Sequence, residues 1–325
     1  MAPKRPREDG GAGGGEGKGK GKGKGKHEPK PKPQHNPKEE HAHPRKRFYR
    51  ARAHSNPLND ASFDVPTRPE DFDWGDHFPE LHQEWTERRA AAATAAAAGE
   101  QEQAAAAGAG PSSEEEPPLV RFVDIGCGFG GLLVKLATIY PDTLMMGMEI
   151  RDKVSEYVRE RIAALRRETP GSYKNCSVLR TNAMKYLPNY FRKGQLTKMF
   201  FLFPDPHFKT ANHRRRIINT HLITEYAHLL APGGWLYTIS DVPELGEWMK
   251  AKLDSHPLFE RVSEEELEAD PAANLLDKSS EEGLKVARSG GSTYRNVYRR
   301  LEKPRQLPAS VAPAPAGLKA TIPTD

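Results

Sequence analysis

The chain is poor in cysteine and contains no long apolar run, and each absence excludes a class of protein. Its 325 residues include only two cysteines, Cys127 and Cys176. Two thiols cannot form a disulfide framework or a structural zinc site, so the cysteine content fits a reducing compartment. No apolar stretch reaches membrane-spanning length, and the N-terminus lacks the apolar segment of a signal peptide. We therefore expect neither a membrane span nor a secretion signal.

Positive charge is concentrated at the N-terminus. Residues 1–50 hold 15 Lys and Arg against 6 Asp and Glu, although the whole chain has a net charge of only +5. Residues 1–44 are low in complexity, with alternating Gly and Lys, and cannot bury a core. We expect a disordered basic tail that is attracted to polyanions. The basic clusters at residues 4–7 and 45–47 predict localisation in the nucleus, with the cytoplasm as a second location.

Composition divides the remainder of the chain into four parts. Bases alternate with aromatic residues after position 45, and this pattern suits either RNA contact or packing of an extended arm on the main domain. Phe72, Trp74, Phe78 and Trp85 supply apolar side chains that can dock on a core. The expected parts are an N-terminal arm packing on the core and near RNA (45–88), a low-complexity insertion (89–118), a folded domain (119–302) and a disordered C-terminal tail (303–325).

Strands and helices alternate through the folded domain, which predicts an α/β fold. Alternation of this kind gives a mostly parallel sheet with helices on both faces, as in Rossmann-like folds, and here we expect an antiparallel last strand. The predicted helices are residues 131–140, 153–166, 222–230 and 244–252, the third of them stopped by residues 232–234 (PGG). The predicted strands are residues 120–125, 144–150, 177–180, 199–203, 235–239, 259–262 and 296–300.

A glycine turn follows the first predicted strand. Gly126, Gly128 and Gly130 remove Cβ atoms where a backbone passes close to a ligand or adopts positive φ. The match to G-x-G-x-x-G is weak by itself, and a plain tight turn would give the same pattern. Asp124 disfavours a pyrophosphate at this position, because a phosphate requires donors and positive potential. A cationic cofactor without phosphate, S-adenosylmethionine, suits the carboxylate better.

Polar residues stand at the ends of three further predicted strands. Glu149 ends the second strand, Asn182 follows the third, and Asp205 follows the fourth. Ligands of open α/β sheets gather at the carboxyl ends of the strands. We expect Glu149 to accept both ribose hydroxyls, Asn182 to read an adenine edge, and Asp205 to lie beside the reacting group.

These residues carry a resemblance to a known family. The chain resembles the catalytic subunit of the eukaryotic tRNA (guanine-N7)-methyltransferases, which are class I S-adenosylmethionine-dependent enzymes, over about residues 45–88 and 119–302. The segment containing LFPDPH is the specific part, whereas the glycine motif is shared by a whole superfamily. The matching segments are residues 52–57 (RAHSNP), 124–131 (DIGCGFGG), 147–151 (GMEIR), 181–184 (TNAM), 200–209 (FFLFPDPHFK) and 281–283 (EEG).

The resemblance implies a set of cofactor contacts and one active-site acid, Asp205. It implies no metal. A segment of threonine and acid that closes over the site in the family corresponds to residues 280–282, where this chain has serine in place of threonine. The cofactor contacts implied by the motifs are Asp124, Gly126, Gly128, Glu149, Ile150, Arg151, Asn182, Ala183, Leu202, Ser280, Glu281 and Glu282.

The resemblance also implies a substrate and a partner. The family transfers a methyl group from S-adenosylmethionine to N7 of a guanine in the variable loop of tRNA, and it works with a non-catalytic WD-repeat subunit as a heterodimer. A basic cluster just beyond the fourth strand favours phosphate contacts that position the RNA, although a solvated face is the usual explanation of such a cluster. The expected RNA-binding residues are Arg52, His54, Asn56, His207, Lys209, Arg214, Arg215 and Arg216.

The chemistry of guanine suggests what Asp205 does. N7 has a lone pair and loses no proton on attack, so alignment and desolvation should supply the rate. A carboxylate can stabilise the cationic product ring or hold the N1–H and N2–H edge. Two other functions stay open: an RNA methyltransferase for exocyclic amines, in which an aromatic residue normally stands where this chain has His207, and a catalytically silent RNA-binding protein.

Overall fold

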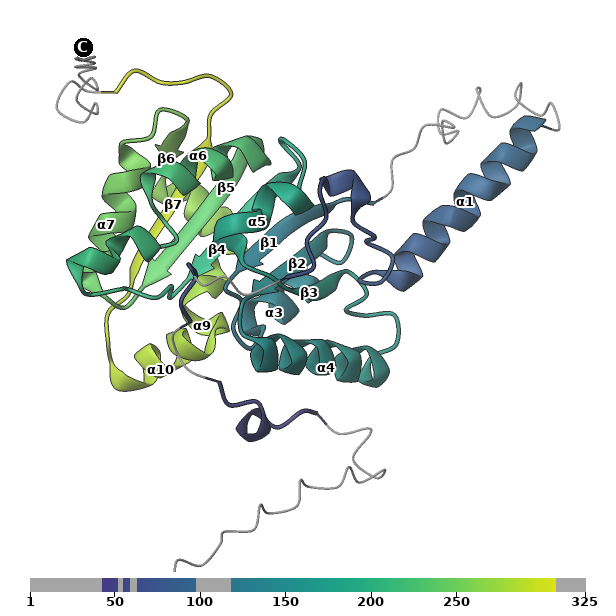
Figure 1. Ribbon diagram of the computed structural model, residues 1–325, viewed down its shortest axis with the longest axis horizontal. Coiled ribbons are helices and arrows are strands. Elements are labelled where there is room, and N and C mark those ends of the chain that lie inside the picture. The colour runs from purple at the N-terminus through teal and green to yellow at the C-terminus, as the bar shows by residue number, and fades with distance from the viewer. Residues whose placement is uncertain (1–42, 52–54, 59–62, 98–117, 308–325) are drawn as a thin grey trace, which may run out of the picture. The chain divides into compact units, whose positions relative to one another are not determined.

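The computed structural model describes residues 43–51, 55–58, 63–97 and 118–307 (Figure 1). Nearly all of the expected basic tail lies outside these residues, as does most of the expected C-terminal tail and most of the expected insertion.

Seven strands form one sheet in the order β3-β2-β1-β4-β5-β7-β6. The strands from β3 to β5 pair in parallel, and β7 pairs antiparallel with both β5 and β6. The predicted α/β fold with an antiparallel last strand is therefore confirmed. The strands are β1 (Val120–Ile125), β2 (Leu144–Glu149), β3 (Cys176–Arg180), β4 (Leu196–Leu202), β5 (Leu230–Ser240), β6 (Phe259–Arg261) and β7 (Tyr294–Arg300).

Helices cover both faces of the sheet, as Figure 1 shows. Alternate side chains of β1 point to opposite faces, so that Val123 joins one apolar cluster and Phe122 the other. The first face is covered by α5 (Ala183–Tyr190), α6 (Thr220–Leu229) and α7 (Pro243–Asp254). The second face is covered by α3 (Gly131–Ile139), α4 (Asp152–Glu168), α8 (Glu264–Ala269) and α9 (Leu276–Ser279), and α10 (Glu281–Ser289) follows α9.

The boundary between α6 and β5 differs from the prediction. Residues 232–234 were expected to separate the helix from the strand, but α6 ends earlier, at Leu229, and β5 begins at Leu230. Between the pairs Leu196–Leu230 and Lys198–Trp235 the register shifts, because three extra residues bulge out of β5. Gly233 has a φ of 81°. Proline and glycine occur in strand bulges as well as at helix ends, and here they mark a bulge within β5.

The N-terminal arm packs on the sheet domain. Phe78 is buried in the first apolar cluster, and Phe72 and Trp74 pack against the same cluster. The arm also contains the short 3-10 helices η2 (Lys46–Phe48) and η3 (Pro69–Asp71). Helix α1 (Pro79–Ala97) continues through the boundary expected at residue 88, because its second half is rich in alanine, the strongest helix former.

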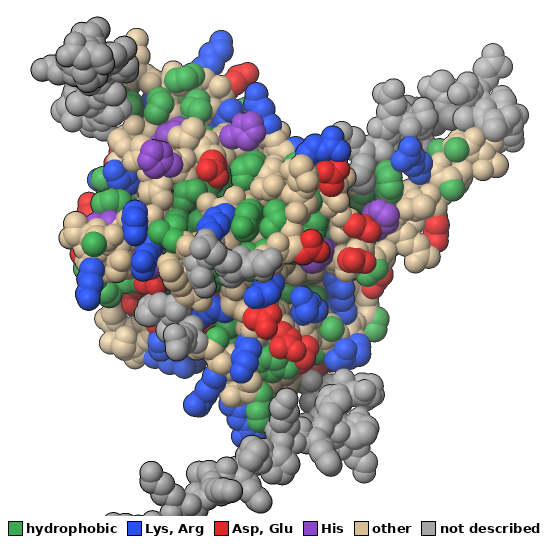
Figure 2. All heavy atoms as spheres, in the orientation of Figure 1, with side chains coloured by type: hydrophobic (Ala, Val, Ile, Leu, Met, Phe, Trp, Pro, Cys, Tyr) green, Lys and Arg blue, Asp and Glu red, His purple; other side chains and the backbone are tan. Residues whose placement is uncertain are grey.

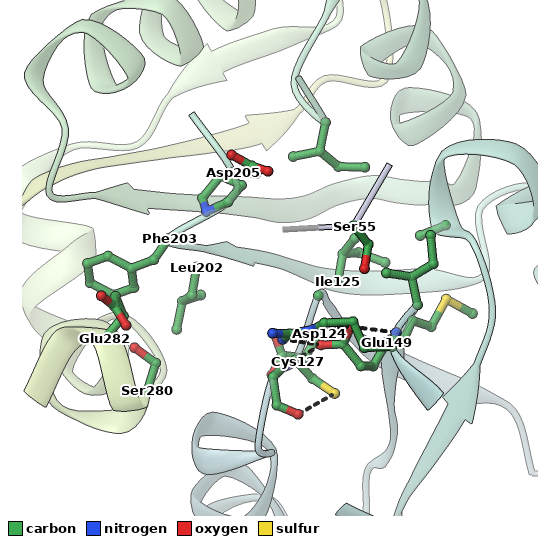
Figure 3. A pocket seen from close by; sticks show the side chains of 18 of the residues that line it. Ser55, Asp124, Ile125, Cys127, Glu149, Leu202, Phe203, Asp205, Ser280 and Glu282 are labelled. Carbon is green, nitrogen blue, oxygen red and sulfur yellow. Dashed lines mark hydrogen bonds and ion pairs between the residues drawn. The ribbon is translucent and has the colours of Figure 1, made fainter. Parts of the chain in front are cut away.

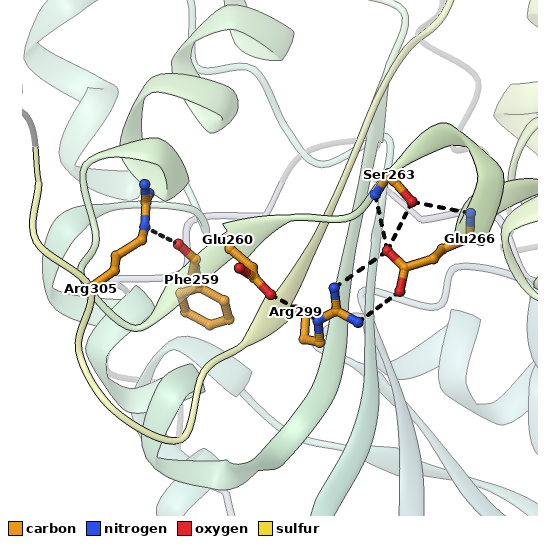
Figure 4. Close-up of polar contacts among 6 residues, drawn as sticks. All are labelled: Phe259, Glu260, Ser263, Glu266, Arg299 and Arg305. Atoms are coloured by element: carbon orange, nitrogen blue, oxygen red, sulfur yellow. Dashed lines mark hydrogen bonds and ion pairs between the residues drawn. The ribbon is translucent and has the colours of Figure 1, made fainter.

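The outer strands are joined by ion pairs. Arg299 of β7 donates to Glu260 of β6 at 3.0 Å and to Glu266 of α8 at 2.7 Å, as Figure 4 shows. Ser263 and Glu266 also form a capping box at the start of α8. These bonds hold β6 and α8 against β7. Among the described residues, no helix combines the length and apolar character needed to cross a bilayer.

Candidate active site

The carboxyl ends of β1, β2, β4 and β5 surround a cavity of about 650 Å³. Its volume lies within the range of small-molecule sites. Figure 3 shows Asp124 and Glu149 on one side of this cavity, Ser280 and Glu282 on another, and Asp205 at a third. Every cofactor-binding residue expected from the sequence lines it, as does Asp205. The cofactor-binding residues expected from the sequence therefore surround one cavity.

The glycine turn leaves open space facing the cavity. Gly126 and Gly128 have φ values of 72° and 54°, which side-chain-bearing residues rarely adopt. A Cβ atom at either position would meet no protein atom within 4 Å. The glycines are therefore required by the backbone conformation, and the space beside them is available to a ligand.

The carboxylate of Glu149 is buried and has several donors. It accepts hydrogen bonds from the backbone N–H of Gly128 at 3.2 Å and of Arg151 at 3.0 Å. The guanidinium of Arg151 also grips both carboxylate oxygens, at 3.0 and 2.8 Å. A ribose that binds Glu149 must therefore share the carboxylate with Arg151 or displace it. The two expected cofactor contacts form one unit.

Asp124 has an unusual electrostatic environment. The residue is 3% exposed, and no hydrogen bond from a described residue reaches its carboxylate. Burial, together with the nearby charge of Glu149, raises the pKa of Asp124 from 3.8 to about 7. A cation placed beside Asp124 would therefore favour its ionised form, which is what the ammonium group of S-adenosylmethionine could do.

The side-chain amide of Asn182 makes two hydrogen bonds that the sequence did not predict. Its oxygen accepts the backbone N–H of Met184 at 3.0 Å and caps α5, while its nitrogen donates to the carbonyl of Pro57 at 2.6 Å. The amide thus ties the N-terminal arm to the sheet. Reading of an adenine edge by Asn182 stays a prediction, and it would require the amide to release Pro57.

Helix α10 closes one side of the cavity. Ser280 caps it by accepting the backbone N–H of Gly283 at 3.0 Å, so serine supplies the hydroxyl that this position needs. A Cβ atom on Gly131 would lie 2.0 Å from the carbonyl oxygen of Ser279, so only glycine allows this close approach to α3. Lys46 of the arm pairs with Glu281 and lies 5.4 Å from the centre of the Phe129 ring.

Asp205 lies on a tightly bent segment after β4. Phe203 and His207 have φ values of 49° and 44°, a conformation that is uncommon outside glycine and is concentrated at functional sites. The backbone N–H of His207 donates to the Asp205 carboxylate at 3.3 Å. The carbonyl of Pro206 accepts a hydrogen bond of 2.9 Å from Arg216. These contacts fix the carboxylate at the edge of the cavity.

The comparisons with known proteins agree with this geometry. A family model described as "Putative methyltransferase" matches residues 119–296. The tRNA (guanine-N(7)-)-methyltransferase of Zea mays is 57% identical over 258 residues, which cover 79% of this chain and 93% of that protein. The protein of the same name from Mus musculus is 49% identical over 272 residues, which cover 84% of this chain and 96% of that protein. The chain belongs to the tRNA (guanine-N7)-methyltransferase family.

The residues of this family member fit S-adenosylmethionine. The open space beside Gly126 and Gly128 accommodates a ligand, and Asp124 lies where a cation would stabilise its ionised form. Glu149 offers a carboxylate beside that space. Among the described residues, no group of three or more His, Cys, Asp or Glu side chains is arranged to hold a metal ion.

Arg216 is a correction to the expected RNA-binding set of the methyltransferase. Its side chain is 1% exposed, and it bonds the Pro206 carbonyl and, at 2.7 Å, Glu244. Its guanidinium also lies 4.7 Å from the centre of the Trp248 ring. Because the guanidinium is buried and bonds the Pro206 carbonyl and Glu244, it is not exposed to a phosphate in this structure, and Arg216 supports the Asp205 segment. The three arginines were expected in one basic cluster, but Arg214 is exposed, Arg215 lines the cavity and Arg216 is buried.

The other residues of that set differ in position. Lys209 and Arg214 are exposed, whereas His207 and Arg215 line the cavity. Asn56 is exposed and accepts the backbone N–H of Leu58 at 3.2 Å. Arg52 and His54 lie outside the described residues. On the face shown in Figure 2, Lys and Arg side chains are interspersed with Asp and Glu.

Several residues of the cavity wall were missed by the sequence reasoning. Asp241 directly follows β5 and lines the cavity, so the rule that located Glu149 and Asp205 applies to it as well. Ser55 and Pro57 of the arm line the cavity too, and nothing in the sequence indicated how the arm folds back. Phe203 and Lys285 also line the cavity without having been expected there, as do Ile217 and Val242.

Proposed function

We propose that the protein transfers a methyl group from S-adenosylmethionine to N7 of a guanine in the variable loop of tRNA. Membership of the family supports the acceptor. The observation that carries the proposal is the shared cavity, in which the glycine turn, Asp124 and Glu149 lie within one space with Asp205 on its edge. A methyl donor and an acceptor ring must meet in such a space for direct transfer.

The reaction forms a bond between the methyl carbon and N7 and breaks the bond between that carbon and sulfur. The positive charge passes from the sulfonium to the guanine ring, and no proton leaves N7. S-adenosylmethionine supplies the electrophilic methyl group. The chain supplies position, because Asp205 can accept hydrogen bonds from the N1–H and N2–H edge and stabilise the developing ring charge.

Nucleoside analysis tests the proposal directly. The full chain is incubated with bulk tRNA and isotope-labelled S-adenosylmethionine, and the digested nucleosides are separated by mass spectrometry. We expect label in N7-methylguanosine. Label in an N6-methyladenosine or N4-methylcytidine fraction would identify an exocyclic-amine methyltransferase. Cofactor binding without label in any nucleoside would contradict transfer to tRNA.

We also propose that the protein works with a WD-repeat subunit. The family resemblance and the high identity to relatives over most of their length support this assignment. Co-expression of the full chain with a candidate WD-repeat protein, followed by size-exclusion chromatography, should give one complex of equal stoichiometry. Separate elution at micromolar concentrations would contradict the proposal.

A nuclear location is proposed from the basic N-terminal sequence. Residues 1–44 contain the cluster KRPR and alternating lysines. A fluorescent fusion of the full chain should accumulate in the nucleus, and a fusion lacking residues 1–44 should accumulate less. Equal distribution of the two fusions would show that the tail does not direct import.

A further inference from the structure

Phe208 is a large apolar side chain that the fold leaves in solvent. It is 68% exposed, the largest exposed fraction among the large apolar side chains of the described chain. It belongs to neither of the two apolar clusters. An exposed aromatic residue is unremarkable when it stands alone on a distant surface. Phe208, however, directly follows the segment that carries Asp205.

The position of Phe208 is fixed by its neighbours. Asp205, Pro206 and His207 line the cavity, and the left-handed φ of 44° at His207 turns the chain just before the phenyl ring. Arg216 holds the carbonyl of Pro206 from behind. On the other side, Lys209 precedes the 3-10 helix η5 (Thr210–Arg215), and the N–H of Asn212 donates to its carbonyl at 2.7 Å. The ring is therefore presented from an anchored backbone.

The basic residues that follow Phe208 in the chain favour a nucleic acid as its contact. Lys209 and Arg214 are exposed close by in the sequence, and Arg215 lines the cavity. An aromatic ring among cationic side chains is the combination that binds unstacked bases together with their phosphates. A guanine that enters the cavity has to leave its stack, and the base next to it then loses a stacking partner.

We propose that Phe208 stacks on the base adjacent to the target guanine and replaces the partner that this base loses. The inference rests on the proposed function and adds a positioning residue to it. Stacking on a protein ring depends on the ring face and tolerates any base. Phe208 should therefore contribute to RNA binding and to alignment of the guanine without contributing to cofactor binding.

The test combines protein variants with altered RNA. The full chain carries Phe208→Ala, Phe208→Tyr or Phe208→Leu, with Ile139→Ala as the control, since Ile139 is 40% exposed at the end of α3. The RNA is a tRNA substrate, intact or with an abasic residue on the 5′ or 3′ side of the target guanine. For each protein variant we measure the Kd for S-adenosylmethionine. For each combination of variant and RNA we measure the Kd for that RNA and the single-turnover rate.

Phe208→Ala should raise the Kd for intact tRNA about 5- to 150-fold, the range that corresponds to about 1–3 kcal/mol per stacked base. Phe208→Tyr should stay close to the wild type, Phe208→Leu should resemble Phe208→Ala, and cofactor affinity should not change. One of the two abasic RNAs should bind the wild-type protein more weakly than intact tRNA by a similar factor. Phe208→Ala should bind that RNA and intact tRNA equally well.

Three results would overturn the inference. The first is an unchanged RNA affinity in Phe208→Ala, and the second is a wild-type affinity in Phe208→Leu. The third is that the abasic RNA weakens binding to Phe208→Ala by the same factor as it weakens binding to the wild type. The last result would place Phe208 against another part of the RNA or against a protein. Failure of the proposed function is read separately, from the absence of N7-methylguanosine in the wild-type reaction.

Discussion

Two buried aspartates near opposite ends of the parallel strands have pKa values shifted in opposite directions. Asp124, near the carboxyl end of β1, is 3% exposed, and burial and the charge of Glu149 raise its pKa to about 7. Asp270 is 8% exposed and lies beside Lys198, near the amino end of β4. Burial alone would raise the pKa of Asp270, but a hydrogen bond from Tyr237 and the charge of Lys198 lower it below its ordinary value.

The difference separates a structural carboxylate from a binding carboxylate. Asp270 accepts hydrogen bonds from Tyr237 at 2.7 Å, from Lys198 at 2.9 Å and from the backbone N–H of Ala273 at 3.1 Å. Asp124 has no such donors among the described residues and faces a cavity. A buried ionised carboxylate without a cation is unfavourable, so a cationic ligand bound in the cavity would stabilise the charge of Asp124.

The largest expected effect concerns Asp205, the acid on the edge of the same cavity. Asp205→Asn should lower the single-turnover rate of methyl transfer at least 100-fold, which corresponds to about 2.7 kcal/mol. S-adenosylmethionine affinity should be almost normal, since the amide removes only the charge. The matched control is Asp142→Asn, an exposed aspartate that lies before β2. A variant that keeps most of its rate would make Asp205 a turn residue.

Removal of Glu149 should affect binding more than chemistry. Glu149→Ala is expected to weaken S-adenosylmethionine binding tenfold or more, because a charge-assisted hydrogen bond contributes about 1.5–3 kcal/mol. The structure adds that Arg151 would also lose its partner. Calorimetry measures the cofactor affinity of Glu149→Ala. The control is Glu260→Ala, which removes a carboxylate that pairs with Arg299 and does not line the cavity. Unchanged affinity in folded Glu149→Ala would remove this residue from the site.

The structural carboxylate should show the opposite pattern. Asp270→Asn should lower the free energy of unfolding by about 2 kcal/mol, because Lys198 and Tyr237 would lose an ionised acceptor. Cofactor affinity should not change, since Asp270 does not line the cavity. Urea unfolding and calorimetry on the same preparation measure both quantities. Weakened cofactor binding at full stability would mean that the two regions are coupled.

The smallest effect is expected from a change outside both regions. Deletion of residues 1–44 should leave the midpoint of thermal unfolding and cofactor affinity unchanged, while weakening tRNA binding severalfold at low salt. Loss of counterion release explains this, so the effect should shrink as salt is raised. Binding titrations over a range of salt concentrations test it. A deletion variant that does not fold would show that the tail belongs to the core.

The sequence predicted the fold well because its signals are local. Apolar runs, glycine turns and acids at strand ends depend on a few neighbouring residues, and β1, β2 and the glycine turn lie where these patterns place them. The break at residues 232–234 was misread because proline and glycine mark bulges as well as chain turns. Whether β5 continues past them depends on pairing with β4, which is a distant part of the chain.

Individual side-chain roles were harder to predict. Residues 209–216 contain one lysine, one histidine and three arginines, which in the sequence form a single basic run. Arg216 nevertheless turns inward, because its guanidinium packs on Trp248 and bonds Glu244, both in α7. Asn182 likewise binds Pro57, which is 125 residues away. Such partners become visible only once the chain is folded. The rule for strand ends would have found Asp241, had it been applied to β5.

Proton release on cofactor binding tests the central claim most directly. Because the pKa of Asp124 is raised, its contribution to the stability of the free protein is present below about pH 4 and is lost as the pH rises through about 7. A bound cation should lower this pKa, so S-adenosylmethionine affinity should rise with pH through that range. Calorimetry near pH 6.5, in buffers that differ in ionisation enthalpy, counts the protons exchanged. We predict net release by the wild type and almost none by Asp124→Asn, whereas equal release by both proteins would contradict the account.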